Sequence, residues 1–217
     1  MQIADQQLSE LAITLPMATE IFRKNRLDFC CGGKQTLREA CEKRKIDLNS
    51  MVKQLEGLAK KSGPTYEEMP LDEMTAYIVD RYHNDLRRRF PELLALAQKV
   101  EQVHGDHANC PVGLFALLND MHKEMLMHMM KEENVLFPMI QNGAGHNAFM
   151  PIKVMNAEHE SHGQQLEEAH RLTSDFTPPE GACGTWRALY SGLEKLEEEI
   201  MEHIHLENNI LFPRALG

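Results

Sequence analysis

Two segments of the chain read HMMKEENVLFP (residues 128–138) and HIHLENNILFP (residues 203–213). The second begins 75 residues after the first, and the two share His, Glu, Asn, Leu, Phe and Pro at matching positions. A repeat at a fixed distance indicates a duplicated structural unit, here a helical hairpin with pseudo-two-fold symmetry. In each copy the His and the Glu are four residues apart, so a helix presents an imidazole and a carboxylate on one face. The repeat therefore preserves a pair of side chains of the metal-ligand type.

Four long stretches with helical periodicity contain the repeat. The gaps between them, GDHANCP (105–111), QNGAGHN (141–147) and SDFTPPEGACG (174–184), hold Gly or Pro where helices are expected to end. Sustained β-branched alternation is absent, so no strands are expected. The sequence predicts an all-α fold whose larger part is an up-down-up-down four-helix bundle, with Pro91 bending or restarting its first helix. The four helices are expected at about residues 71–104, 112–137, 151–173 and 185–212.

The part of the chain before the bundle reads as several short helices between about residues 7 and 61. Thr36 followed by Glu39 has the form of a capping box. The stretch KSGPTYEEMP (61–70) carries one Gly and two Pro, which is typical of an interdomain linker. We therefore expect a small helical N-terminal domain at residues 1–63 and the bundle at residues 64–217.

Composition excludes several classes of function. The 217 residues carry a formal charge of −10, which argues against binding to nucleic acid or anionic lipid. No apolar run approaches the roughly 18 residues of a membrane helix, and the start of the chain lacks the basic-then-apolar order of a secretory signal. Five cysteines, an odd number, make a poor disulfide framework. We expect a soluble cytoplasmic protein without a nucleic-acid or membrane partner.

One histidine from each bundle helix is expected at the same height, because distances counted from the gaps at about 1.5 Å per residue differ by only a few ångströms. A single His and Glu pair more often lies on a solvated helix face than in a metal site. Two such pairs in register on alternate helices favour the metal site instead. Six mixed ligands without Cys exceed the four of a structural zinc site and suit two iron or manganese ions, with both carboxylates spanning the pair. The predicted ligands are His83, His128, Glu132, His159, His203 and Glu207.

The remaining histidines receive no ligand role. His104 lies 21 residues after His83, about 31 Å along a continuous helix, and only a sharp break at Pro91 would bring it back to the site. His162 is expected beside the ligands or on the surface rather than on a metal. The others are expected on polar faces or in loops: His107, His122, His146, His170 and His205.

A vicinal cysteine pair, Cys30 and Cys31, lies just before the predicted Thr36 helix start. Its position near a helix N-terminus, with Arg26 and Lys34 close in sequence, predicts a lowered thiol pKa. One hypothesis is thiolate chemistry, in redox exchange or in metal and sulfur handling. The other is a pair of half-buried small side chains at a tight turn. The sequence alone favours neither.

The segment LDFCCGGKQTL (27–37), in a small helical domain that precedes the two repeated segments, resembles the iron-sulfur cluster repair di-iron family, the repair-of-iron-centres proteins of bacteria. The resemblance covers nearly the whole chain and implies a hemerythrin-like bundle with two non-haem iron ions, bridged by oxo and carboxylate groups. It implies cytoplasmic repair of iron-sulfur clusters damaged by nitric oxide or oxidants, by donation of iron, with damaged iron-sulfur proteins as clients. It places the iron ligands on the six residues predicted above and the cysteine motif on Cys30 and Cys31.

The chain also departs from the oxygen-carrying hemerythrins, whose third helix supplies two His in HxxxH form. Here Gly163 follows His159 at that spacing, so fewer imidazoles imply open or water-filled positions and more labile iron. Two alternatives stay open: an enzyme that reduces nitric oxide to nitrous oxide at the metal pair, and a sensor in which a ligand such as nitric oxide or oxygen changes the docking of the small domain. Whether the protein is an enzyme, and whether it forms a homo-oligomer, also stays open.

Overall fold

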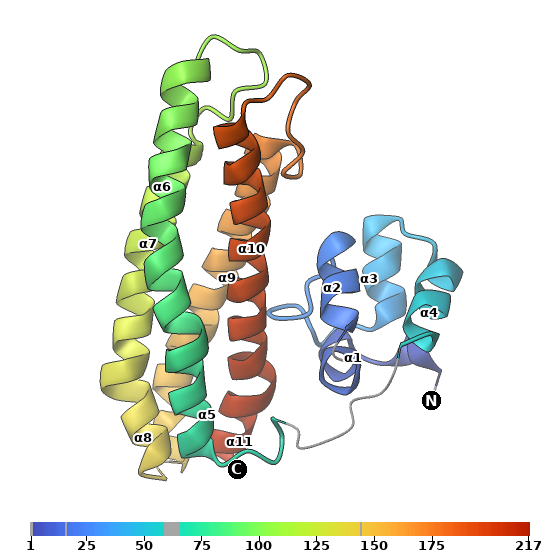
Figure 1. Cartoon of the computed structure of the whole chain (residues 1–217). Coiled ribbons are helices and arrows are strands. Elements are labelled where there is room, and N and C mark those ends of the chain that lie inside the picture. The colour runs from blue at the N-terminus through green and yellow to red at the C-terminus, as the bar shows by residue number, and fades with distance from the viewer. Residues whose placement is uncertain (1, 16, 59–65, 144) are drawn as a thin grey trace.

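Four long antiparallel rods form a bundle, and a small group of helices lies against one side of it (Figure 1). This computed structural model describes residues 2–15, 17–58, 66–143 and 145–217, and every regular element within them is helical. The predicted all-α fold with a four-helix bundle is confirmed. The rods comprise α5 (Leu71–Ile78), η2 (Val79–His83) and α6 (Asn84–His104); α7 (Leu114–Lys131), η3 (Glu132–Leu136) and α8 (Phe137–Gln141); α9 (Phe149–Thr173), preceded by the turn η4 (Gly145–Ala148); and α10 (Gly184–Leu206), η5 (Glu207–Leu211) and α11 (Phe212–Leu216).

Two apolar cores hold the bundle together, one on each side of a polar middle layer. The first contains Leu86, Leu118 and Leu193 and extends into the small domain, and the second contains Ile78 and Phe137 near the other end of the rods. Burial of such side chains stabilises a fold by about 1.5 to 3 kcal/mol each. This apolar surface fixes the rods around the middle layer. None of the described helices has the length and apolarity needed to cross a lipid bilayer.

Three of the four rods contain a π-helical turn at the level of the polar layer. His83 ends η2, whereas Glu132 begins η3 and Glu207 begins η5. A π-turn inserts one extra residue into an α-helix and changes the direction of the side chains around it, and such turns occur frequently at functional sites. The two copies of the repeat thus share this local distortion as well as their residues.

Helix α6 runs without interruption from Asn84 to His104 through Pro91. Of the two effects predicted for Pro91, bending or restarting the helix, the restart is contradicted. Proline removes one backbone hydrogen bond of the helix and crowds only the turn before it. The apolar contacts of Phe90 and Leu93, on either side of Pro91, keep both halves of the helix packed on the bundle. His104 therefore stays at the far end of the rod.

The small domain consists of short helices, one of which begins with the predicted capping box. Thr36 accepts a hydrogen bond from the Glu39 backbone N–H (3.3 Å), and the Thr36 N–H donates to the Glu39 carboxylate (2.8 Å), which is the predicted capping box. The expected domain boundary between residues 63 and 64 lies outside the described residues. The elements of this domain are η1 (Ile3–Asp5), α1 (Leu8–Thr14), α2 (Ala18–Lys24), α3 (Leu37–Arg44) and α4 (Leu48–Glu56).

The small domain contacts the bundle through the loop after α2 and through ion pairs. Phe29 in this loop is 1% exposed, and its ring lies 5.4 Å from that of His205 on α10. Arg26 pairs with Asp175 (2.7 Å) and with Glu167 of α9. Partly exposed ion pairs contribute only up to about 1 kcal/mol each, so the buried aromatic contact carries more of the docking energy.

Gly33 allows this loop to pass close to α1. A Cβ atom added there would lie 2.4 Å from the carbonyl oxygen of Phe29 and 2.9 Å from the Cβ of Ser9. The Ser9 hydroxyl and the Ser9 backbone N–H both donate to the Gly33 carbonyl, each at 3.0 Å. A larger residue would therefore push apart the loop and the helix that support the cysteine pair.

Replacement of Gly33 by alanine is expected to lower the free energy of unfolding by about 1 to 3 kcal/mol, because the clash is with backbone atoms that cannot turn aside. Gly163→Ala in α9 is the matched control: its added Cβ meets nothing within 4 Å, so it is expected to raise stability by about 0.5 to 1 kcal/mol. Urea unfolding of the metal-free protein measures both. Equal effects of the two changes would contradict the assignment.

Candidate metal centre

Six polar side chains meet in the middle layer of the bundle, between its two apolar cores. Each of them is at most 1% exposed. They come from all four rods, so the bundle itself sets their positions. They are the six residues predicted from the sequence: His83, His128, Glu132, His159, His203 and Glu207.

The four imidazoles form two pairs through their Nε2 atoms. The Nε2 atoms of His83 and His203 are 3.1 Å apart, and those of His128 and His159 are also 3.1 Å apart. Two nitrogen ligands at about 2.1 Å from one ion and at right angles to each other stand about 3.0 Å apart. The spacing of each pair therefore fits one metal ion with neighbouring imidazole ligands.

Glu132 lies between the two imidazole pairs. Its Oε1 atom is 3.3 Å from Nε2 of His128, and its Oε2 atom is 3.4 Å from Nε2 of His83. Each oxygen of this carboxylate thus faces a different pair. A carboxylate in that position can span two metal ions.

Glu207 repeats the arrangement from the opposite rod. Its Oε1 atom is 3.0 Å from Nε2 of His203, and its Oε2 atom is 3.2 Å from Nε2 of His159. Two sets of four ligand atoms result, each with two imidazoles and one oxygen from each carboxylate. These sets are His83, Glu132, His203 and Glu207, and His128, Glu132, His159 and Glu207.

All four oxygens of Glu132 and Glu207 are buried without a hydrogen-bond partner. Leaving a buried carboxylate without compensation costs several kcal/mol. Nitrogen and oxygen lone pairs from two directions converge on the same volume, which is the donor set that iron and manganese prefer. The residues present therefore fit two hard or borderline cations better than they fit any packing role.

Hydrogen bonds on the outer ring nitrogens fix three of the imidazoles. Nδ1 of His83 lies 2.6 Å from Glu133 Oε1, and Nδ1 of His128 lies 2.9 Å from Glu158 Oε2. Nδ1 of His159 lies 2.7 Å from Asn208 Oδ1. Because these partners are acceptors, each Nδ1 donates a proton to its partner, and Nε2 is the nitrogen that faces the layer and can bind a metal ion once it is unprotonated.

His203 is the exception, since its buried Nδ1 has no hydrogen-bond partner. Glu158 directly precedes His159 and supports His128 of the neighbouring rod. The equivalent residue before His83 is Tyr82, whose ring stacks on His203 at 5.9 Å and offers no acceptor to Nδ1. The pseudo-two-fold symmetry is therefore broken at His203, and the two candidate ligand sets differ.

Electrostatics favour ionised carboxylates in this layer. Burial opposes charge on Glu132, but the facing imidazoles of His128 and His83 outweigh it and hold the pKa of Glu132 well below its usual value. Burial also lowers the pKa of His128, yet Glu132 and Glu158 raise it to about 10 in the metal-free protein. Burial lowers the pKa of His203 despite Glu207. His203 is therefore the least basic member of its pair with His83, whose pKa is raised by the surrounding carboxylates.

Other histidines lie outside the two ligand sets. His104 Nε2 lies 3.2 Å from Cys183 Sγ, and its ring lies against Trp186 at the far end of the bundle. His162 packs on His128 with ring centres 5.2 Å apart, and burial lowers its pKa to about 3. His170 and His205 are buried rather than on polar faces, a correction that follows from the small domain covering this side of α9 and α10.

The cysteine loop approaches the metal layer from the side. Cys31 Sγ lies 3.4 Å from the carbonyl oxygen of His159. Asn208 accepts from His159 Nδ1 and donates from Nδ2 to the carbonyl oxygen of Cys30 (3.1 Å). One amide side chain thus joins the loop to a predicted ligand.

The predicted lowering of the thiol pKa was wrong for Cys30. A hydrogen bond with Cys31, burial, and the nearby Asp28 carboxylate raise the pKa of Cys30 well above its usual value. The expected positive neighbour Arg26 pairs instead with Glu167 and Asp175. In the metal-free protein this thiol is therefore protonated at neutral pH.

Sequence reasoning missed the three partners of the outer ring nitrogens, Glu133, Glu158 and Asn208. A signal existed for two of them, because Glu133 and Asn208 directly follow the carboxylates Glu132 and Glu207 at equivalent positions of the repeat. Glu158 directly precedes a predicted ligand. A search for acceptors beside each ligand would have found all three.

Comparison with known proteins agrees with this site. The model of the hemerythrin HHE cation binding domain matches residues 74–215, and the ScdA_N model, described as a domain of unknown function, matches residues 4–59. An iron-sulfur cluster repair protein YtfE of Yersinia pseudotuberculosis (serotype O:1b, strain IP 31758) is 50% identical over 100% of this chain and 99% of the relative. The YtfE protein of Yersinia pestis (strain Pestoides F) has the same identity and coverage.

The matches cover both parts of the chain, and the relatives align with it from end to end. The hemerythrin-like match implies that the bundle binds non-haem iron, in agreement with the His and Glu ligand sets. The chain therefore belongs to the family of iron-sulfur cluster repair proteins with a hemerythrin HHE cation-binding domain.

Proposed function

We propose that this protein repairs iron-sulfur clusters damaged by nitric oxide or oxidants, in the cytoplasm, by donating iron from a pair of non-haem iron ions. Its clients are iron-sulfur proteins, as its relatives, named iron-sulfur cluster repair proteins, indicate. The proposed ligands are His83, His128, Glu132, His159, His203 and Glu207, with both carboxylates bridging. We further propose the division into an N-terminal domain at residues 1–63 and the iron-binding bundle at residues 64–217.

The observation that carries donation, rather than permanent storage, is the missing partner of His203. An acceptor on the outer ring nitrogen raises the basicity of a metal-bound imidazole and fixes its orientation. His83, His128 and His159 have such an acceptor, whereas His203 has a stacked Tyr82. The ion held by His83 and His203 is therefore the more weakly bound of the two and the one available for transfer.

The chain's own residues prepare that transfer. Glu132 and Glu207 hold negative charge in a dry layer and keep both positions occupied by cations. Glu133, supported by Arg87 at 2.6 Å, holds His83 in place, whereas Nδ1 of the neighbouring His203 has no hydrogen-bond partner. Iron supplies the missing metal of a damaged cluster once it has left these ligands.

Replacement of both Glu132 and Glu207 by alanine is expected to lower the iron content from about two ions per chain to well below one, and to abolish iron transfer. The reason is that each carboxylate supplies an oxygen to both ligand sets. Metal analysis and transfer of labelled iron to an apo-cluster protein measure the two effects. Undiminished repair by the double variant would exclude iron donation from this centre.

Chelation of iron from the wild-type protein is expected to be biphasic, with one ion released at least about tenfold faster than the other. Glu158→Ala removes the acceptor of His128 and is expected to speed the slow phase by about 10- to 100-fold, leaving the fast phase unchanged. Glu160→Ala, two residues away on the exposed face of α9, is the matched control and is expected to leave both phases unchanged. A single phase for the wild-type protein contradicts the proposed difference between the positions.

Iron affinity is expected to rise with pH through the neutral range. The metal-free His128 has a pKa of about 10, so it carries a proton at pH 7 that the ion must displace. Raising the pH removes this competition, and each unit from 6.5 to 8.5 is expected to increase the affinity about tenfold for one displaced proton. Competition with a chelator of known pH dependence measures the slope, and a flat profile would count against His128 as a ligand.

A further inference from the structure

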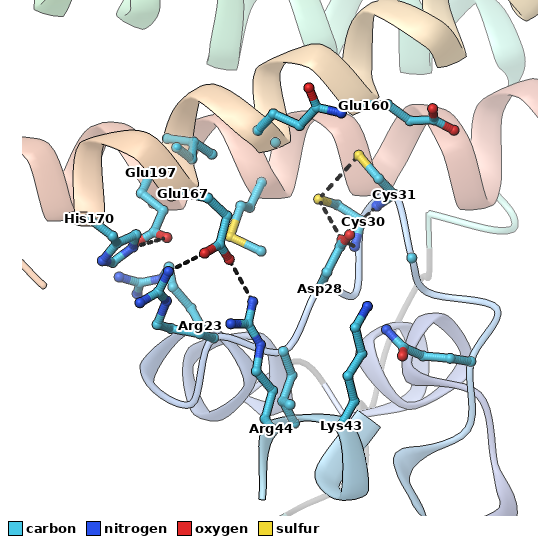
Figure 2. A pocket seen from close by; sticks show the side chains of 18 residues that line it. Arg23, Asp28, Cys30, Cys31, Lys43, Arg44, Glu160, Glu167, His170 and Glu197 are labelled. Atoms are coloured by element: carbon cyan, nitrogen blue, oxygen red, sulfur yellow. Dashed lines mark hydrogen bonds and ion pairs between the residues drawn. The ribbon is translucent and has the colours of Figure 1, made fainter. Parts of the chain in front are cut away.

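A second group of metal-ligand side chains lies in the cysteine loop, outside the His and Glu layer. Asp28, Cys30 and Cys31 each offer one atom within 4.8 Å of the other two. The Sγ atoms of Cys30 and Cys31 are 3.8 Å apart, and Cys30 Sγ is 3.4 Å from Asp28 Oδ1. Figure 2 shows the two thiols and the carboxylate close together at one end of a pocket. All five cysteines are free, so no disulfide occupies the pair.

The two separations that involve Cys30 match those of ligands on one tetrahedral ion. Two thiolates at about 2.3 Å from such an ion stand about 3.8 Å apart, and a thiolate and a carboxylate oxygen at about 2.0 Å stand about 3.5 Å apart. The observed separations between Cys30 and Cys31 and between Cys30 and Asp28 are 3.8 and 3.4 Å. Two sulfur ligands favour thiophilic cations, whereas the polar layer of the bundle offers only His and Glu ligands and no sulfur.

The loop is fixed in this arrangement before any ion binds. The backbone N–H groups of Cys30 and Cys31 donate to Asp28 Oδ1 at 3.2 and 2.9 Å, which positions the carboxylate. Asn208 and Asn209 of η5 donate to the Cys30 carbonyl at 3.1 and 3.3 Å, which positions the backbone of the pair. Little ordering is left for metal binding to impose.

A fourth coordination position would open toward a cleft between the small domain and the bundle. The cleft has a volume of about 460 Å³, and Asp28, Cys30 and Cys31 form part of its wall. Two thiolates and a carboxylate leave a divalent ion with a net charge of −1, which favourable cations can offset. Lys43 lines the same cleft (Figure 2), whereas Arg26 and Arg44 pair with Glu167, and Arg23 pairs with Glu198.

We propose that Asp28, Cys30 and Cys31 form a second metal site that binds one thiophilic divalent cation through three protein ligands, with its fourth position open to the cleft. Binding forms two metal–sulfur bonds and one metal–oxygen bond and releases the proton of each thiol to solvent. Structural zinc sites have four protein ligands, whereas three protein ligands with one open position leave room for water or for a ligand from another molecule. A thiolate or another anionic group of a second molecule can complete the coordination.

The test uses Co²⁺ as the probe, because thiolate ligands give it an intense near-ultraviolet charge-transfer band. The full-length protein, reduced and with its bundle loaded with iron, is titrated with Co²⁺ without oxygen. We expect one equivalent to bind with the thiolate band and tetrahedral visible bands, while the iron content stays constant. Absence of the thiolate band, or Co²⁺ uptake only by displacement of iron, overturns the proposal. Because iron is counted separately, this outcome is independent of the repair assay.

Three variants and one control locate the ion. Cys30→Ser and Cys31→Ser are each expected to lose the thiolate band at one equivalent, and Asp28→Asn is expected to weaken Co²⁺ binding by at least about tenfold. Cys110→Ser removes a free cysteine far from the loop in sequence and is expected to change nothing. Unchanged iron content and helical circular dichroism show that each variant is folded. A thiolate band that survives in both serine variants would falsify the site.

Discussion

The burial of two carboxylates among four imidazoles is the constraint on which the bundle depends. Charges at this depth are tolerated only when opposite charge compensates them, and the four carboxylate oxygens have no hydrogen-bond donor. Bound cations meet that need, and without them His128 takes up a proton and its pKa rises to about 10. The apolar cores on either side provide the stability that a polar middle layer cannot. The two buried carboxylates therefore favour the binding of cations. The bundle itself is stabilised by its apolar cores and not by hydrogen bonds to these carboxylates.

The duplication explains the symmetry of the centre, and its imperfections explain how the two halves differ. Glu133 and Asn208 occupy equivalent positions and support His83 and His159, each on the preceding rod. A carboxylate raises the basicity of an imidazole more than an amide does. Although the two contacts have the same geometry, His83 is therefore made more basic than His159. The greater inequality is at His203, where Tyr82 replaces an acceptor. Identical ligand types therefore do not give identical affinities.

The helices and the convergence of the six polar side chains were predictable because both follow from periodicity along the chain. Spacing of four residues, repetition at a fixed offset and the length of each rod determine which side chains share a height. The outer partners depend on contacts between segments far apart in sequence. The expected effect of Arg26 on the thiols also fails for that reason. Arg26 illustrates this, since its charge is neutralised by Glu167 and Asp175 on the bundle rather than left beside the cysteines. The unbroken α6 likewise depends on tertiary packing of Phe90, which outweighs the local effect of Pro91.

Asn208 connects the two parts of the molecule at the level of the metal ligands. Its Oδ1 atom accepts from Nδ1 of His159, and its Nδ2 atom donates to the Cys30 carbonyl, which Asn209 also contacts. Asn208 also lies in the π-turn that begins at Glu207. The cysteine loop, one imidazole of the polar layer and the turn that carries one of its carboxylates therefore meet at a single side chain.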